Sequence, residues 1–307
     1  MVKPKILIIA GPTATGKSAL AIEVGRLFGA EIISADAMQV YRYMDIGTDK
    51  PSLEQRKLVT HHLIDVRYPD EEFSAALFRE EAQRTIANIQ ERGKKPVVVG
   101  GTGLYIKVLV SGLINGGAVD NTTRDRLRRV MLTEGREHLY QRLNEIDPVT
   151  AATLHVNDAY RIIRALEYYE TTGRPISTVR RRHAFGEDHY QMLMVGLIQQ
   201  RGALYRRIDR RVDEMMARGF LEEVEGLLDM GYSPSLKPMQ SIGYKQIAAH
   251  LLHRCDLSEA VRGTKRDTRR YAKRQITWFK ANPDIHWFAY PEEEDAIFGL
   301  IKRFWRN

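Results

Sequence analysis

Cysteine is almost absent from this sequence, since Cys255 is the only one among 307 residues. A single thiol excludes a disulfide within the chain and a zinc site built from several cysteines. Long apolar runs are absent too, because no segment approaches the roughly 20 apolar residues of a membrane-spanning helix. The first residues, MVKPKILIIAG, lead straight into an apolar run and leave no room for a cleavable signal. We therefore expect a cytoplasmic protein without membrane association.

Acidic residues are fewer than basic ones, 39 against 47, which gives a formal net charge of +8. This bias alone favours a polyanionic partner only weakly. It is concentrated at 264–280, TKRDTRRYAKRQITWFK, where seven lysines or arginines accompany one acid, Asp267. On a helix, most of them would share a broad face beside an apolar stripe of Ala272, Ile276 and Phe279. That face is either an ordinary solvated surface or a site for nucleic-acid phosphates.

Apolar runs that suit buried strands recur along the chain, at 5–11, 30–36, 61–66, 95–101 and 191–198. Helical spacing lies between them, most clearly at 17–29 and 74–93. Strands that alternate with helices are typical of a parallel, doubly wound sheet of the α/β class. Such sheets bind ligands at the carboxyl ends of their strands.

A phosphate-binding loop follows the first predicted strand. The loop, GPTATGKS, consists of Gly11, Pro12, Thr13, Ala14, Thr15, Gly16, Lys17 and Ser18. Glycines at this spacing let backbone amides approach a phosphate at the amino terminus of the next helix. Lys17 would neutralise the terminal phosphates, and the Ser18 hydroxyl would bind Mg²⁺.

A helical insertion interrupts the sheet pattern. Residues 120–190 have helical spacing, are rich in arginine and show no clear strand, whereas a strand pattern resumes at 191. We expect an α/β fold, with a P-loop NTPase-like parallel sheet flanked by helices and a helical insertion domain. The first part of the core would be 1–119, and its continuation, with the basic C-terminal helices, would be 191–307.

An acid that could hold Mg²⁺ for hydrolysis is missing where it is expected. The strand at 95–101 runs into Gly100, Gly101, Thr102 and Gly103, and offers no carboxylate. Asp65, in HLIDV, is a weaker candidate because its strand is short. Transfer of a group to an acceptor therefore fits better than motor-type hydrolysis.

Two polar residues end predicted strands near the phosphate loop. Asp36 could accept a proton from an attacking nucleophile, or it could cap the following turn. Thr102 lies in a glycine-flanked loop that allows close approach to a ligand, or it could serve turn geometry alone.

Seven motifs occur in order: GPTATGKS (11–18), DAMQVYRYMDIGTDKP (36–51), HHLID (61–65), VGGTGLY (99–105), NDAYRIIRALE (157–167), SIGYKQ (241–246) and TRRYAKRQITWF (268–279). Together they resemble the tRNA dimethylallyltransferase (tRNA isopentenyltransferase) family over nearly the whole chain. The long second motif is far more specific than a phosphate loop. Two positions depart from the family pattern: Ala37 replaces a usual serine, and Tyr160 replaces a usual glutamine.

The resemblance implies transfer of a dimethylallyl group from dimethylallyl diphosphate to N6 of the adenosine 3′-adjacent to the anticodon in tRNA. The loop amides, Lys17 and Mg²⁺ on Ser18 would hold the leaving diphosphate. Asp36 would receive the amine proton, and Thr102 would lie near the bridging oxygen.

The resemblance also implies an arginine over the diphosphate. Arg211, in RRIDRRVDE, is the best candidate. The alternative is an ordinary ion pair of Arg211 with Asp209 or Glu214.

The partner implied is the anticodon stem-loop of tRNA, bound in part by the insertion domain, and a monomer is expected. The tRNA contacts implied are Asp36, Ala37, Met38, Gln39, Thr102, Arg124, Tyr160, Arg161, Ile162, Ile163, Arg164, Gln240, Ser241, Ile242, Gly243, Tyr244, Lys245, Arg270, Lys273 and Arg274. Two other functions use the same loop. A small-molecule kinase would leave the insertion and basic helix without a purpose, and a nucleic-acid-binding switch would need no proton acceptor.

Overall fold

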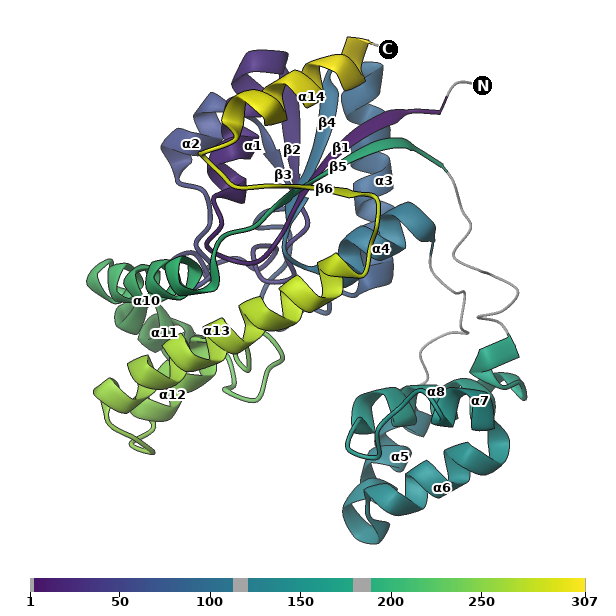
Figure 1. Ribbon diagram of the computed structural model, residues 1–307. Coiled ribbons are helices and arrows are strands. Elements are labelled where there is room, and N and C mark those ends of the chain that lie inside the picture. The colour runs from purple at the N-terminus through teal and green to yellow at the C-terminus, as the bar shows by residue number, and fades with distance from the viewer. Residues whose placement is uncertain (1–2, 113–120, 179–188, 307) are drawn as a thin grey trace. The chain divides into compact units, whose positions relative to one another are not determined.

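The computed structural model describes residues 3–112, 121–178 and 189–306 (Figure 1). Contacts divide the chain into two compact units, which we call the sheet unit, 1–110 with 188–307, and the insertion unit, 111–187. The sequence placed the insertion at 120–190. Each unit is described by itself.

A six-stranded parallel sheet forms the centre of the sheet unit, in the order β3-β2-β4-β1-β5-β6. Its strands are β1 (Lys5–Ala10), β2 (Ala30–Ser34), β3 (His61–His62), β4 (Lys95–Gly100), β5 (Gln191–Leu197) and β6 (Ile285–Phe288). The α/β prediction and its five strands are confirmed. The strand β6 was not predicted, because its four residues at a sheet edge carry too little pattern to distinguish them from the adjoining helices.

Helices cover both faces of the sheet. They are α1 (Lys17–Phe28), α2 (Leu53–Leu58), α3 (Ala75–Glu91), α4 (Gly103–Ser111) and α14 (Glu294–Arg306). Alternate strand residues such as Leu7 and Ile9 share one core with Leu20 of α1 and Ile297 of α14. Because α3 leads from β3 to β4, opposite in direction along the sheet to the connection through α1, right-handed crossovers place it on the other face. The two layers are visible in Figure 1.

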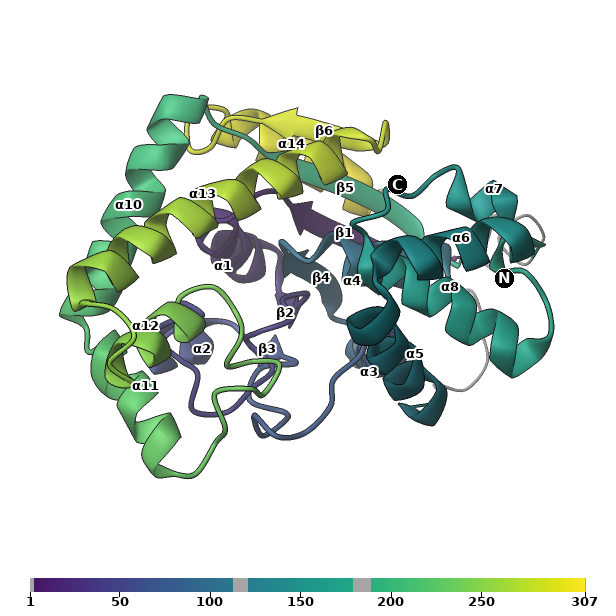
Figure 2. The same cartoon turned by 90° about the horizontal axis from the view of Figure 1, so that it is seen from below.

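Four further helices gather at the carboxyl ends of the strands. They are α10 (Arg201–Ala217), α11 (Phe220–Asp229), α12 (Tyr244–Leu251) and α13 (Leu257–Lys280). Ala14, in the loop after β1, packs against Leu204, Ile208 and Ala272 of α10 and α13. Figure 2 shows the four helices grouped beside the strand ends. Helices therefore cover the edge of the sheet where ligands bind.

The insertion unit has its own hydrophobic core. Its helices are α5 (Asn121–Glu134), α6 (Arg136–Ile146), α7 (Pro148–Ala151) and α8 (Ala159–Thr172). Leu127, Leu143 and Leu166 are fully buried between them. Within the described residues of this unit, 121–178, no strand is present.

Candidate active site

The phosphate loop connects β1 to α1 through two glycines with positive φ. Gly11 has φ 136°, and a Cβ there would lie 2.5 Å from the carbonyl oxygen of Leu197 on β5. Gly16 has φ 95° and is the residue before α1. Positive φ and close backbone approach both favour glycine, so the spacing of the motif follows from the turn itself. The turn leaves the amino terminus of α1 facing the strand ends.

Lys17 lies in this loop and donates a hydrogen bond to the Pro12 carbonyl oxygen, at 2.7 Å. Burial lowers the pKa of its ammonium group to about 7, with Arg211 adding to the effect and Asp36 opposing it. A cation held this way lacks a full counter-charge, so an anion in the loop would stabilise it.

A cavity of about 620 Å³ opens in front of the loop. Ser18 and Lys17 line it from α1, and Arg207, Arg210 and Arg211 line it from α10. With Arg218, five lysine and arginine side chains line one cavity, which suits a ligand with several negative charges. The sequence analysis missed Arg207, although it stands one helical turn before Arg211 on the same face.

Arg211 reaches the phosphate loop. It donates a hydrogen bond to the hydroxyl of Thr13, and its Nε lies 3.2 Å from Asp49 Oδ2. The predicted alternative, an ion pair with Asp209 or Glu214, is wrong. Those two acids pair with Arg269 and Arg210 instead.

Asp36 lies two residues after the end of β2 and caps a turn. Its Oδ1 accepts hydrogen bonds from the amides of Met38 and Gln39, at 2.8 and 3.4 Å. The turn occupies Oδ1 only, and the carboxylate also lines the phosphate cavity. Capping and proton acceptance are therefore compatible in this geometry.

Thr102 lies beside Asp36 and ties two loops together. Its Oγ1 accepts a hydrogen bond from the amide of Ala37 at 3.0 Å, and its own amide donates to the Ala35 carbonyl at 3.3 Å. Tyr271 of α13 joins this group: burial first, and then the charge of Asp36, raise the pKa of its hydroxyl to about 12. Tyr271 is thus a neutral hydrogen-bonding group next to the carboxylate.

A second cavity, of about 390 Å³, meets the first at this point. Both cavities are lined by Thr13, Asp36, Thr48, Arg211 and Tyr271. Many predicted tRNA contacts line the second cavity: Asp36, Ala37, Met38, Thr102, Gln240, Ser241, Ile242, Gly243, Tyr244 and Arg274. Its apolar lining comes from Ile208, Val212, Met215 and Phe220.

Gln39 and Lys245 are among the predicted contacts that lie outside that lining. Gln39 lines the first cavity, where its side chain accepts a hydrogen bond from Ser34 and donates to the carbonyl oxygens of Thr48 and Asp49. Lys245 pairs with Asp267 at 3.6 Å.

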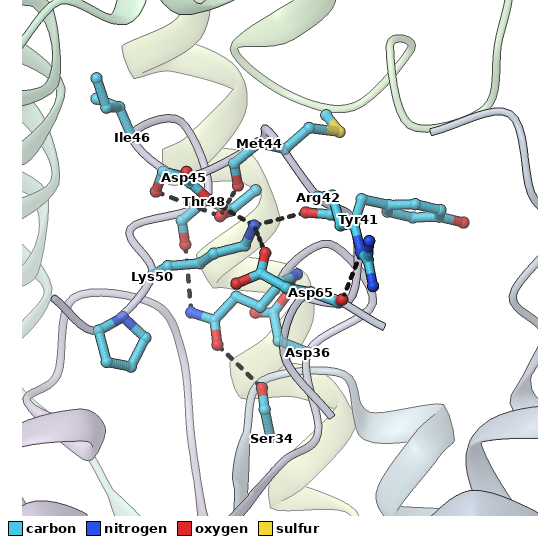
Figure 3. Close-up of polar contacts among 12 residues, drawn as sticks. Ser34, Asp36, Tyr41, Arg42, Met44, Asp45, Ile46, Thr48, Lys50 and Asp65 are labelled. Carbon is cyan, nitrogen blue, oxygen red and sulfur yellow. Dashed lines mark hydrogen bonds and ion pairs between the residues drawn. The ribbon is translucent and has the colours of Figure 1, made fainter. Parts of the chain in front are cut away.

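The long loop between β2 and α2 is built around a buried lysine (Figure 3). The ammonium of Lys50 donates hydrogen bonds to the Tyr41 carbonyl, Asp45 and Asp65, at 2.5 to 2.6 Å. The other carboxylate oxygen of Asp65 pairs with Arg56 at 2.7 Å. Asp65 therefore serves the loop scaffold, and it lines neither cavity.

Gln275 of α13 is a second residue that the sequence analysis missed. Its Oε1 accepts a hydrogen bond from the Thr13 amide, and its Nε2 donates to the Gly101 carbonyl, both at 2.9 Å. One buried amide thus joins the phosphate loop to the loop that carries Thr102. The sequence does contain a signal for this role. Gln275 is a polar residue on the apolar side of a basic helix, about one turn from both Ala272 and Phe279.

The outer face of α13 carries predicted tRNA contacts. Arg270, Lys273 and Arg274 are exposed there. Arg269 differs, because it pairs with Asp209 of another helix, α10, whereas Arg270 pairs with Asp267 of its own helix. The helix therefore presents a basic face outward and a structural face to the phosphate loop.

In the insertion unit, the predicted contacts divide into surface and core. Tyr160 is 73% exposed. Arg161 is exposed as well, and lies 3.2 Å from Asp158. Ile162 and Ile163 are 1% and 6% exposed. The periodicity of α8 turns these two side chains into the core of the unit, and contact of this segment with tRNA stays a prediction.

Two predicted contacts of the insertion unit share one buried partner. The carboxylate of Glu167 is fully buried, and it accepts hydrogen bonds from Arg124 at 3.0 to 3.1 Å. Arg164 pairs with it at 3.1 Å. Both arginines therefore serve the fold of this unit.

Comparison with known proteins identifies relatives along the whole chain. The family model described as IPP transferase matches residues 39–282. The tRNA dimethylallyltransferase 2 of Geotalea uraniireducens is 52% identical over 98% of this chain and 97% of that protein. The tRNA dimethylallyltransferase of Geobacter metallireducens is 50% identical over 99% of this chain and 98% of that protein.

Solved structures agree with this result. The tRNA isopentenylpyrophosphate transferase of Bacillus halodurans superposes with a TM-score of 0.73 at 38% identity, covering 98% of this chain and 97% of that one. A eukaryotic dimethylallyltransferase acting on tRNA superposes with a TM-score of 0.77 at 30% identity, covering 93% of this chain and 73% of that one.

Among the described residues, no helix combines the length and apolar character of a membrane span.

Proposed function

This chain belongs to the IPP transferase family, and we propose that it is a tRNA dimethylallyltransferase. The donor is dimethylallyl diphosphate. The acceptor is the N6 amine of the adenosine 3′-adjacent to the anticodon in tRNA. We expect the enzyme to act as a monomer.

One observation carries this proposal: Asp36 and Arg211 line both cavities. The first cavity is cationic and suits a diphosphate. The second has an apolar lining and is bordered by exposed Arg274, which suits an unstacked base and its phosphate. Their junction is where donor and acceptor would meet.

The donor's diphosphate lies in the first cavity. The loop amides, Lys17, Arg207 and Arg211 hold its oxygens, and their positive charge stabilises the charge that builds up on the leaving group. The dimethylallyl group extends toward the apolar residues of the second cavity.

Transfer exchanges one bond for another at C1 of the dimethylallyl group. The bond from C1 to the bridging oxygen breaks, and its electron pair leaves with the diphosphate. The N6 nitrogen forms the new bond to C1 and loses a proton, which the Asp36 carboxylate accepts. Thr102, which holds the Ala37 amide, fixes the backbone next to that carboxylate.

Mg²⁺ would bind in the first cavity with few ligands from the protein. Among the described residues, no group of three or more His, Cys, Asp or Glu could bind a metal alone. Ser18 lines the first cavity, and its hydroxyl with the diphosphate oxygens matches the preference of Mg²⁺ for substrate phosphates and few side chains. When bound, the ion would neutralise part of the leaving group's charge.

The test is a transfer assay with unmodified tRNA, dimethylallyl diphosphate and Mg²⁺, followed by mass spectrometry of the digested nucleosides. We expect N6-dimethylallyladenosine and released diphosphate. A tRNA with guanosine at the target position is the matched control and should stay unmodified. Consumption of ATP with a small acceptor, with tRNA unchanged, would show a kinase instead.

A further inference from the structure

Glu223 of α11 holds the tip of the loop that carries Asp36. Its Oε2 accepts hydrogen bonds from the amides of Asp45 and Ile46, at 2.8 and 2.6 Å, and its Oε1 accepts one from the Gly47 amide at 3.0 Å. Three consecutive backbone amides thus converge on one carboxylate. In the part of the chain that the structure describes, these amides belong to no helix or strand, so Glu223 satisfies donors that need a partner.

The same carboxylate holds the wall of the second cavity. Tyr244 donates its hydroxyl to Glu223 Oε1 at 2.6 Å, and its ring packs edge-on against Phe220, with centroids 5.1 Å apart. Gly47 fits against this pair: a Cβ there would lie 2.2 Å from Phe220 and 2.7 Å from Tyr244. Loop tip and cavity wall are therefore fixed to each other through one residue.

The held turn also reaches the first cavity. The Asp49 amide donates to the Ile46 carbonyl at 3.0 Å, so Asp49 belongs to the turn that Glu223 fixes. The carboxylate of Asp49 pairs with Arg211 at 3.2 Å, and Arg211 donates to Thr13 of the phosphate loop. A continuous set of contacts runs from Glu223 to the arginine over the diphosphate.

We propose that Glu223 is a positioning residue for the transfer reaction. It sets the turn at 45–49 so that Tyr244 shapes the acceptor cavity while Asp49 aims Arg211 at the leaving group. Glu223 itself lines neither cavity and touches no reacting atom. This inference rests on the proposed prenyl transfer.

Glu223→Gln tests the proposal, with Glu225→Gln as the matched control on the exposed side of the same helix. The amide offers one acceptor oxygen in place of two, so part of the amide set loses its partner. In Glu223→Gln, we expect amides of the segment 44–49 to exchange hydrogen faster by mass spectrometry, with the remaining sheet unit unchanged. Inorganic diphosphate should bind about 3- to 10-fold more weakly, and kcat should fall about 10- to 100-fold. Affinity for tRNA should stay within about threefold, since the α13 face is untouched.

Several results would overturn the proposal. Exchange at 44–49 equal to wild type would show that Glu223 does not fix the turn. Faster exchange across the whole sheet unit, or equal losses in Glu225→Gln, would show a general effect on folding. Unchanged diphosphate affinity and an unchanged kcat would show that the turn at 45–49 does not position Arg211. If the wild type transfers no prenyl group, the proposed function fails by itself, while exchange and diphosphate binding still decide the role of Glu223.

Discussion

At the scale of single residues, Asp36 caps a turn and is also the proposed proton acceptor, and replacing it by alanine would remove both functions at once. Its Oδ1 caps the turn at Met38 and Gln39, and the carboxylate as a whole faces both cavities. An alanine would remove the cap together with the base. Asparagine keeps a carbonyl oxygen for the turn and cannot accept the proton.

We therefore expect Asp36→Asn to lower kcat by about 10²- to 10⁴-fold, the usual contribution of a general base. Affinity for tRNA and the melting temperature should stay close to wild type, because the turn remains capped. The measurement is single-turnover transfer with saturating donor. Turnover equal to wild type would remove Asp36 from its proposed role.

Lys17 gives the site a dependence on pH. Its pKa is about 7 in the free protein, below the ordinary value of 10.5, because burial penalises the charged form. The side chain is thus charged below pH 7 and neutral above it. A bound diphosphate favours the charged form and raises this pKa, so binding at pH 8 should take up about one proton.

Calorimetric titration of dimethylallyl diphosphate at pH 8, in two buffers of different ionisation enthalpy, measures this uptake. Lys17→Met is the matched control, and the difference between the two proteins isolates the lysine. The affinity of the wild type should also fall as pH rises above 7. Identical proton uptake in both proteins would contradict the expected titration.

At the scale of elements, α13 has two faces with different duties. Gln275 and Tyr271 contact the phosphate loop and Thr102 on one side, whereas Arg270 and Lys273 are exposed on the other. The spacing of the sequence predicted the basic face. It did not reveal that the inner face holds the catalytic loops.

Replacing Arg270 and Lys273 by alanine should weaken tRNA binding and flatten its dependence on salt. The slope of log K against log salt should fall by about 0.7–0.9 for each phosphate that the variant no longer neutralises. Lys302→Ala with Arg303→Ala on α14 removes the same charge from another exposed surface and serves as control. An unchanged slope in the α13 variant would mean that this face does not bind RNA.

At the scale of the whole molecule, the two units fold around separate cores. The insertion unit contains the fully buried Glu167, held by Arg124 and Arg164. Loss of a partner from a buried ion pair costs about 3–5 kcal/mol. The cost here should be about 2 kcal/mol, because the Arg164 side chain is 31% exposed and water screens it.

Glu167→Ala should therefore destabilise the insertion unit and leave the sheet unit intact. Hydrogen exchange in increasing urea measures each unit separately, and diphosphate affinity reports on the sheet unit. Glu145→Ala, at an exposed position of α6, is the control. Equal destabilisation of both units would contradict independent cores.

The sequence by itself determined the features that depend on neighbours along the chain. Alternating apolar runs gave five strands, glycine spacing gave the phosphate loop, and ordered motifs gave the family. Asp36 and Thr102 could be selected because the end of a parallel strand is a local signal that also locates a ligand site. These signals arise from backbone geometry and periodicity, which act over a few residues.

Only the tertiary structure decided which side chains meet. Only the structure showed that Asp65 pairs with Lys50 and Arg56 and so belongs to the loop scaffold. Glu223 carries no local signal, because the backbone amides that it holds lie 176 to 178 residues away in the sequence. The residue type fixes the charge and the hydrogen-bonding groups of a side chain, but the tertiary structure determines which partner they contact.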